Sequence, residues 1–238
     1  QNWKLSGFHD AVLAPFSDTQ INYFVDHWYA YFSSQKKVDT QNAPGNATLL
    51  KNAIHDNNRL LDLARRPLLL TLMASLHAWR NGKLPERRQE LYEETVDLLL
   101  NRWEGRRVLK DEKGNIIDIL PSLTEWLKVP DRTKIRALLE RLAFEAHQRQ
   151  VRISGTADVP EDDLLLGLVR LQQNKDVNSQ KLKEFLVNRA GLLVPRGQGV
   201  YTFSHRTMQE YLAACHLTRT GYPGKVAHLA CHDPLRWR

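Results

Sequence analysis

The stretch LLVPRGQGVYTFSHRTMQEYLAA, residues 192–214, decides how the chain is interpreted. Two apolar runs, LLVP and VYTF, are joined by the glycine-containing turn RGQG, and this pattern predicts a β-hairpin. The apolar residues that follow fall at helical spacing, which predicts a helix from His205 to about Leu217, with Ser204 able to cap it. A helix N-terminus attracts anions, so His205 is interpreted either as a donor to a bound anion or as a local capping and packing residue.

Three helices are predicted upstream of this hairpin. Asp131 is expected to cap the first, and its inward-facing residues are Ile135, Leu138, Leu139, Leu142 and Ala146. The second is expected from Pro160 to about Gln172, with Asp158 as its cap, and the third from Ser179 to Ala190. Three helices followed by a hairpin are typical of a winged-helix domain, which we assign to residues 131–220.

The first half of the chain predicts a helical bundle domain over residues 17–105. Ser17 and Gln20 form a capping box, which opens a helix after residue 17. A polar loop is expected over 35–47, a second helix from about 47 to 64, and a third from Pro67 to Gly82. A fourth begins at Pro85, and residues 106–130 connect the two domains through a predicted hairpin or ordered loop. The fold class is therefore mainly α, a helical bundle followed by a winged helix with a short β-hairpin.

Composition narrows the classes of function. The 238 residues are 42% hydrophobic and carry a net charge of +7, which favours anionic partners such as phosphates, nucleic acid or an acidic surface. Two cysteines are too few for a disulfide framework and favour a cytoplasmic location. No signal peptide is evident, and the apolar stretch at 67–79 is too short to span a bilayer. The chain starts with Gln1, so we expect it to be a piece of a longer protein.

Catalytic motifs are missing from the sequence. It contains no G-x-x-x-x-G-K-[ST] loop, no H-E-x-x-H, no paired C-x-x-C and no G-x-S-x-G. The pairs Cys215-His216 and Cys231-His232 lack the separated spacing of structural zinc ligands, so no metal site is predicted and Cys215 is interpreted as a small packing residue. We expect the chain alone not to be an enzyme and assign no catalytic residue.

Two segments together resemble the NACHT family of signalling NTPases, particularly its bacterial members. RRPLLLTLMASLHAWRNGKLPERRQELYEETVDLLLNRW (65–103) is similar to the family's first helical domain, and NRAGLLVPRGQGVYTFSHRTMQEYLAA (188–214) to its winged-helix domain. The segments NWKL (2–5) and LAPF (13–16) resemble the region just after the last strand of the nucleotide-binding domain. Residues 1–16 are then the tail of that domain, and residues 221–238, ending in PLRWR, the start of a C-terminal sensor region.

The resemblance implies specific ligand contacts. In the family, an upstream P-loop domain binds ATP or ADP with Mg²⁺, and the helical and winged-helix domains close over the nucleotide. Pro67 matches the proline that contacts adenine, although Arg66 stands before it where the family more often has Asn. His205 matches the histidine that reaches the β-phosphate of ADP in the closed, inactive state. The full-length protein is expected to be a slow ATPase.

The leading hypothesis is therefore the regulatory lid of an ATP/ADP-dependent signalling switch, in bacterial defence or signal transduction. Its expected partners are the upstream NACHT domain, a downstream sensor domain and, on activation, further copies of itself; no membrane contact is expected. The alternative is a DNA-binding winged-helix regulator with a helical interaction domain, whose recognition helix would be residues 179–191. The basic cluster of Arg87, Arg88, Arg102, Arg106, Arg107 and Lys110 is interpreted as a solvated face, with contact to nucleic acid or an acidic domain surface as the less favoured alternative.

Overall fold

The computed structural model describes residues 14–34, 42–80, 82–85, 87–101, 107–110, 116–120, 132–151, 155–171 and 179–237. The chain divides into two compact units, Gln1–Thr95 and Val96–Arg238. The N-terminal tail 1–13 and the expected cap Asp131 lie outside the described residues.

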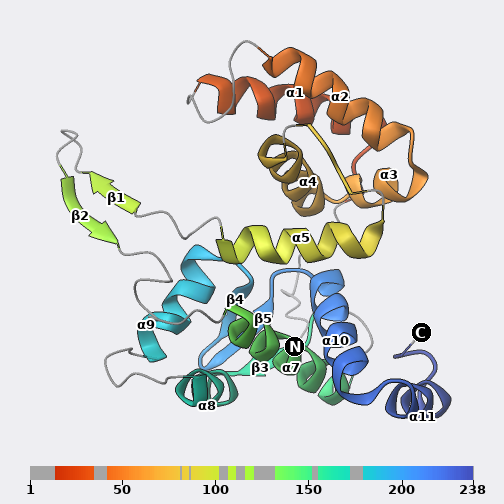
Figure 1. Cartoon of the computed structure of the whole chain (residues 1–238), viewed down its shortest axis with the longest axis vertical. Coiled ribbons are helices and arrows are strands. Elements are labelled where there is room, and N and C mark those ends of the chain that lie inside the picture. Colours follow the sequence, from red (N-terminus) through yellow and green to blue (C-terminus); the bar gives the residue numbers. More distant parts are fainter. Residues whose placement is uncertain are drawn as a thin grey trace, which may run out of the picture. The chain divides into compact units, whose positions relative to one another are not determined.

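Unit 1 is helical throughout its described elements. It contains α1 (Asp18–Ser34), α2 (Ala43–His55), α3 (Asn58–Ala64), α4 (Pro67–Trp79) and the first part of α5 (Arg88–Asn101), which continues into unit 2. Figure 1 shows α1 and α2 side by side, and both also pack on α4. The side chains that fill this core are fully buried: Ile21, Val25, Leu50, Ile54, Leu70, Met73 and Leu76.

Local signals place most of these helix ends. The predicted capping box is confirmed, because the backbone N–H of Ser17 donates to Gln20 Oε1 at 2.9 Å and that of Gln20 to Ser17 Oγ at 3.3 Å. The predicted start of α4 at Pro67 is also confirmed. The helix predicted from 47 to 64 is instead two helices, because the side chain of Asn57 accepts from the N–H groups of Arg59 and Leu60 and starts a new helix.

Two other helix starts differ from the prediction. The expected loop ending at 47 is too long, since α2 begins at Ala43 with Pro44 in its first turn, where a proline costs no hydrogen bond. Helix α5 begins at Arg88 rather than at Pro85. Both differences lie within a turn of a helix end, where sequence signals discriminate least.

Unit 2 has the helices and hairpin of a winged helix. After the hairpin β1 (Arg107–Lys110) and β2 (Ile116–Leu120), which agrees with the connecting hairpin predicted there, come α7 (Arg132–Arg149), α8 (Glu161–Leu171) and α9 (Ser179–Glu184). Helix α9 continues as the π-helical segment η1 (Phe185–Arg189). The predicted hairpin is β4 (Leu193–Gly197) and β5 (Val200–Phe203), and it leads into α10 (Arg206–Gly221) and α11 (Gly224–His232).

A third strand, β3 (Asp158–Pro160), completes a small antiparallel sheet in the order β3-β5-β4. Val159 pairs with Tyr201, and Val194 with Thr202. The prediction that Asp158 caps a helix is wrong: Asp158 lies in the strand, and its carboxylate pairs with Arg196 of β4 at 2.8 Å. The helix starts at Glu161, whose N–H donates to the carbonyl of Gly199.

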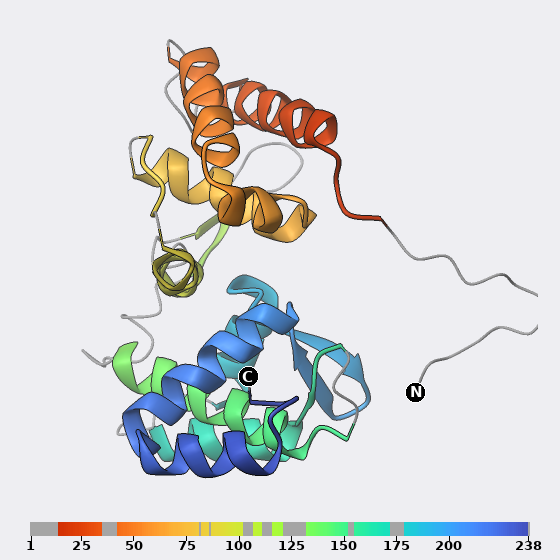
Figure 2. The same ribbon diagram turned by 90° about the vertical axis from the view of Figure 1, so that its right-hand side faces the viewer.

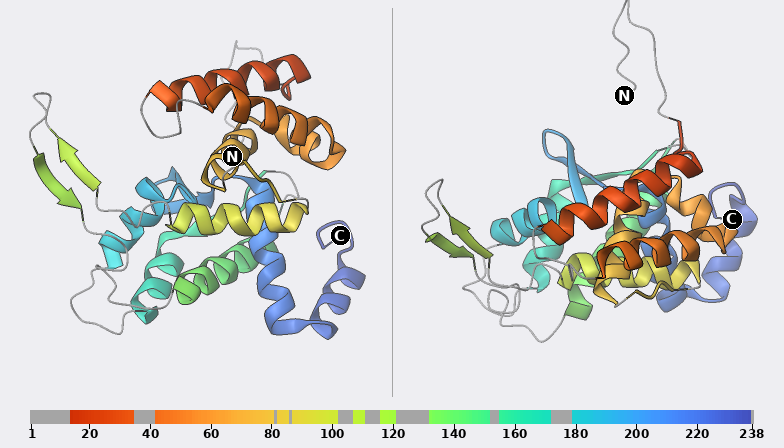
Figure 3. Two further views of the ribbon diagram at one scale, coloured as in Figure 1. Left: turned by 45° about the horizontal axis from the view of Figure 1, so that its top comes forward. Right: turned by 90° about the horizontal axis from the view of Figure 1, so that it is seen from above.

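The core of unit 2 forms where α10 packs along α7. Figure 2 shows this pair of helices, with β4 and β5 at the N-terminal end of α10. All five inward residues predicted for α7 are buried. Figure 3 shows α11 turning back beside α10, and the ring of Trp237, after α11, lies 5.6 Å from that of Phe144 on α7. The mainly helical fold with a small antiparallel sheet confirms the predicted fold class.

Candidate functional site

The junction between β5 and α10 holds the first predicted site residue. Phe203 is buried at the end of β5, and His205 follows in extended conformation, with φ −148° and ψ 140°. His205, and not Ser204 as expected, is the N-cap of α10: its Nδ1 accepts the backbone N–H of Thr207 at 3.2 Å. The backbone N–H of Ser204 instead donates to the carbonyl of Leu192, just before β4, at 3.0 Å.

This cap fixes the chemistry of the imidazole. The hydroxyl of Thr207 lies 2.7 Å from His205 Nδ1, so two groups of one residue hold that ring nitrogen. When Nδ1 of a neutral imidazole accepts, the hydrogen is on Nε2, which is then a donor. The sequence suggested capping and anion binding as alternatives for His205. Capping does not exclude anion binding, because the cap uses Nδ1 and places the hydrogen on Nε2.

Buried hydrogen bonds hold the first turns of α10 against the sheet. Gln209 is fully buried, and its Oε1 accepts the backbone N–H of Ala157 at 2.7 Å while its Nε2 lies 3.3 Å from Nδ1 of His147. The hydroxyl of Thr202 on β5 donates to the carbonyl of Ala157 at 2.9 Å. These bonds link α7, α10, β5 and the chain before β3, and they fix the position from which His205 projects.

A second network lies further along α10, around the buried carboxylate of Glu140 on α7. Arg136 donates to Glu140 at 3.2 Å, to Asp97 at 2.8 Å and to the Tyr211 hydroxyl at 3.0 Å, and Arg219 contacts the same carboxylate at 2.9 Å. Burial alone would lower the pKa of Arg136, but Tyr211, Asp97 and Glu140 raise it above its ordinary value. Arg136 therefore stays charged and cross-links α5, α7 and α10.

The packing expected for the EYLAA segment agrees with these contacts. Leu212 is fully buried, and Tyr211 is half-buried with its hydroxyl on Arg136. Arg206 and Glu210 form the expected i, i+4 pair at 2.6 Å. Cys215 is half-buried, and burial raises the pKa of its thiol, as expected for a packing residue rather than a nucleophile.

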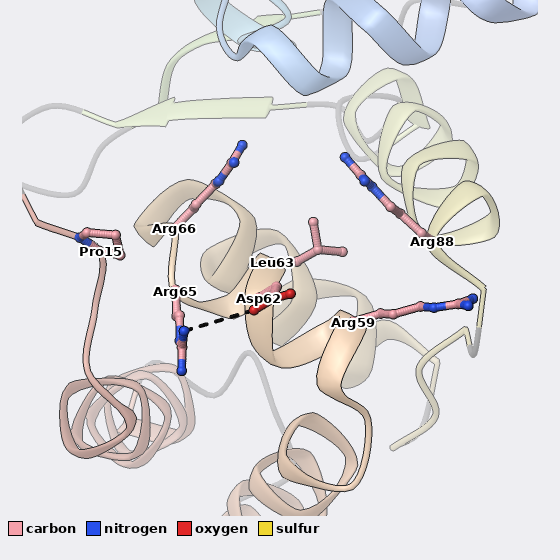
Figure 4. Close-up of a pocket in the computed structure, with 7 residues that line it drawn as sticks. All are labelled: Pro15, Arg59, Asp62, Leu63, Arg65, Arg66 and Arg88. Atoms are coloured by element: carbon pink, nitrogen blue, oxygen red, sulfur yellow. Dashed lines mark ion pairs between the residues drawn. The ribbon is translucent and has the colours of Figure 1, made fainter. Parts of the chain in front are cut away.

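Pro67, the second predicted site residue, belongs to unit 1, whereas His205 belongs to unit 2. Pro67 is exposed at the first position of α4, and the preceding residue, Arg66, is the N-cap with an extended backbone. Arg66 also lines a pocket of about 640 Å³, which Figure 4 shows together with its other lining residues, Pro15, Arg59, Asp62, Leu63, Arg65 and Arg88.

This arginine-lined pocket was not anticipated from the sequence. Its arginines are far apart in the chain and come from α3, the α3–α4 turn and α5, so no local pattern unites them. From the sequence, Arg88 is interpreted as part of a basic face that is solvated or, as the less favoured alternative, meets nucleic acid or an acidic domain surface. A usable signal was nevertheless present: Arg66 stands at the N-cap of α4 and Arg88 at the first position of α5, where the helix dipole disfavours a cation.

The described residues contain neither a cluster of metal ligands nor a membrane-spanning helix. In that part of the chain no three His, Cys, Asp or Glu side chains are grouped so that they could hold a metal ion. None of the helices described there has the length and apolar character needed to cross a bilayer.

Comparison with known proteins matches part of the chain to a protein family. The family described as "Winged helix-turn-helix domain C-terminal to NACHT" has a model that matches residues 88–217, more than half of the chain. No curated protein and no solved structure matches the chain. The matched range begins at the first residue of α5 and includes β3, the wing β4–β5 and most of α10.

Proposed function

Because the chain belongs to the family of winged helix-turn-helix domains that lie C-terminal to NACHT, we propose that it is the regulatory lid of a NACHT-type ATP/ADP signalling switch. In this proposal the upstream NACHT domain carries the nucleotide and its Mg²⁺, and this chain supplies contacts that hold ADP in a closed, inactive state. The chain contributes no catalytic residue, and the whole protein is a slow ATPase that acts in bacterial defence or signalling.

The observation that carries the proposal is the capped histidine at the β5–α10 junction. With Nδ1 of His205 accepting from Thr207, a neutral imidazole carries its hydrogen on Nε2, next to the positive end of a 16-residue helix. A donor at a helix N-terminus suits a phosphate oxygen. His205 would hold the β-phosphate of ADP, and the neighbouring Gln209 network would keep the helix end in place.

Regulation in this scheme requires differential affinity. ADP must bind the closed arrangement more tightly than the open one, because a ligand with equal affinity for both shifts nothing. His205 would supply part of that difference. Pro67 would contribute the adenine contact from unit 1, since its exposed ring presents an apolar face.

DNA binding is the weaker alternative, because one described cation of the expected recognition helix and one on the wing are both held in ion pairs. In the expected recognition helix, Lys183 pairs with Glu161 at 2.6 Å and is buried, with its ammonium 5.9 Å from the centre of the Tyr201 ring. On the wing, Arg196 pairs with Asp158 and also donates to the carbonyl of Thr156. A phosphate-binding face would need such cations directed to solvent.

The test compares two substitutions of His205 in the full-length protein. His205→Ala removes both cap and donor, whereas His205→Asn keeps an N-cap acceptor and removes the imidazole. We expect both to lower the amount of ADP that co-purifies and to raise basal signalling. In the isolated 238-residue chain, where loss of ADP does not enter, His205→Asn should retain wild-type thermal stability. Wild-type ADP content in His205→Asn would show that His205 only caps the helix and would overturn the assignment.

The DNA alternative is tested on the same preparations. Duplex DNA is titrated at about 50 and 200 mM salt, and a specific phosphate-binding interface would lose affinity by orders of magnitude between the two. We expect binding no tighter than that of an unrelated protein of similar charge. Tight, salt-dependent binding that Arg196→Ala weakens would favour the alternative.

A further inference from the structure

The pocket in unit 1 is strongly cationic. Of its seven lining residues four are arginines and only Asp62 is acidic. Arg65 is neutralised, because its guanidinium lies 4.0 Å from Asp62 and 3.7 Å from Asp18. The other three arginines, Arg59, Arg66 and Arg88, form no ion pair with a carboxylate in the described part of the chain, which leaves three positive charges around one hollow.

The three side chains come from separate elements. Arg59 is on α3, Arg66 is the N-cap of α4, and Arg88 is the first residue of α5. Figure 4 shows the guanidinium groups of Arg66 and Arg88 extended to the same side of the pocket, with Leu63 between them, and Arg59 reaching along the side nearest Arg88. Arg88 is steadied by Tyr92, whose hydroxyl is 3.5 Å from it and whose ring centre is 5.5 Å away.

This arrangement is unfavourable unless an anion occupies it. Like charges around one hollow repel one another, and Arg66 and Arg88 also stand at the positive ends of α4 and α5. The buried side chain of Leu63 gives the pocket an apolar surface between the charges. A volume of about 640 Å³ matches that of small-molecule sites, and the planar guanidinium fork matches phosphate oxygens in pairs.

We propose that this pocket binds a compact ligand with clustered phosphate groups, held by Arg59, Arg66 and Arg88. The phosphates can belong to a free polyphosphate or to a nucleotide, and both present the same oxygens to the three guanidinium groups. The proposal does not rest on the ADP-dependent lid, because the pocket is formed by unit 1 alone and does not use His205.

The test titrates inorganic tripolyphosphate into the intact 238-residue chain by calorimetry at about 50 mM salt. We expect saturable one-to-one binding that Arg59→Gln, Arg66→Gln and Arg88→Gln each weaken about tenfold, roughly the effect of losing one charge-assisted contact. All three side chains are on exposed residues, so the variants should fold, and circular dichroism checks this.

Two neighbouring arginines provide matched controls. Arg87, next to Arg88, pairs with Glu90 at 3.7 Å and does not line the pocket; Arg65 lines it but is neutralised. Arg87→Gln and Arg65→Gln should change affinity by no more than about twofold, since neither removes an unpaired charge. No saturable binding by the wild type, or equal losses in Arg87→Gln and Arg88→Gln, would overturn the proposal.

Parallel titrations with ATP, ADP and tripolyphosphate identify the source of the phosphates. Tighter binding of a nucleotide than of tripolyphosphate, weakened by Arg66→Gln, would assign the pocket to a nucleotide. Equal or tighter binding of tripolyphosphate would assign it to a free polyphosphate. Because His205 is not in unit 1, His205→Asn should leave these affinities unchanged, which separates failure of this proposal from failure of the lid.

Discussion

The hydroxyl of Tyr29 lies 2.5 Å from Nδ1 of His77 inside the core of unit 1, joining α1 to α4. Both residues are buried, and burial lowers the pKa of His77 to about 4 and raises that of Tyr29. Within the described residues, Nε2 of His77 has no hydrogen-bond partner. The pair is thus a neutral, buried cross-link that cannot accept a proton cheaply.

The first prediction is a loss of stability on mild acidification. His77 has a pKa of about 4 when folded and about 6.5 when unfolded, so the unfolded chain binds the proton more readily. The stabilisation that depends on neutral His77 is fully present above pH 6.5. It is lost as the pH falls towards 4, which lowers the free energy of unfolding by roughly 3 kcal/mol in total. Urea unfolding of the whole chain at pH 7.5, 6.0 and 5.0 measures this. His77→Gln cannot titrate and should show a flatter profile; an equally steep one would exclude His77 as the cause.

The second prediction concerns the hydrogen bond itself. Tyr29→Phe removes the hydroxyl and leaves both ring nitrogens of a buried histidine unsatisfied, which should cost about 1–2 kcal/mol at pH 7.5. Tyr23→Phe, on the same helix at an exposed position, is the control and should change unfolding by less than about 0.5 kcal/mol. Equal effects of the two substitutions would contradict a special role for the buried pair.

The third prediction tests the Glu140 network. Glu140→Ala removes a buried carboxylate that contacts both Arg136 and Arg219, and it should destabilise unit 2 by about 2–4 kcal/mol because Arg136 keeps only Asp97 as an acidic partner among the contacts described above. Glu210→Ala breaks a half-exposed pair with Arg206 and should cost less than about 1 kcal/mol. Guanidinium chloride would screen the charges of this network and mask its effect, so urea is used as the denaturant. A small effect for Glu140→Ala would show that the network is not stabilising.

Features set by neighbouring residues could be predicted from the sequence, whereas features that depend on distant contacts could not. Ser17–Gln20 and Pro67 were correctly predicted as helix starts, because each signal acts within one helical turn. Asp158 was misassigned because a helix cap is a local pattern, whereas its actual pairing with Thr202 of β5 involves a residue more than forty positions away. His205 can be identified as a candidate from its position after the predicted hairpin. Its tautomer can be inferred only from the contacts with Thr207, which the structure shows. The arginine pocket depends on tertiary structure, and its local signal is limited to the cations Arg66 and Arg88 at two helix starts.

The last prediction compares two helical glycines with opposite surroundings. Glycine lowers helix stability relative to alanine, so Gly→Ala is favourable wherever the added methyl group has room. Around Gly45, in the first turn of α2, a Cβ would meet nothing within 4 Å, and Gly45→Ala should stabilise the chain by about 0.5 kcal/mol. Gly167 on α8 faces Leu138 of α7 so closely that a Cβ would overlap its Cδ1.

Leu138 is itself buried between helices, so it can move only by displacing its neighbours. Overpacking of this kind costs about 1–3 kcal/mol, which exceeds the gain in helix propensity. Gly167→Ala should therefore destabilise unit 2. In the double variant Gly167→Ala/Leu138→Ala much of the steric clash is removed, but the protein loses the packing of the deleted leucine atoms. Urea unfolding of the single and double variants measures the coupling. If the free-energy changes of the two single variants simply add in the double variant, Gly167 and Leu138 are not in contact. The packing of α8 against α7 described here would then be incorrect.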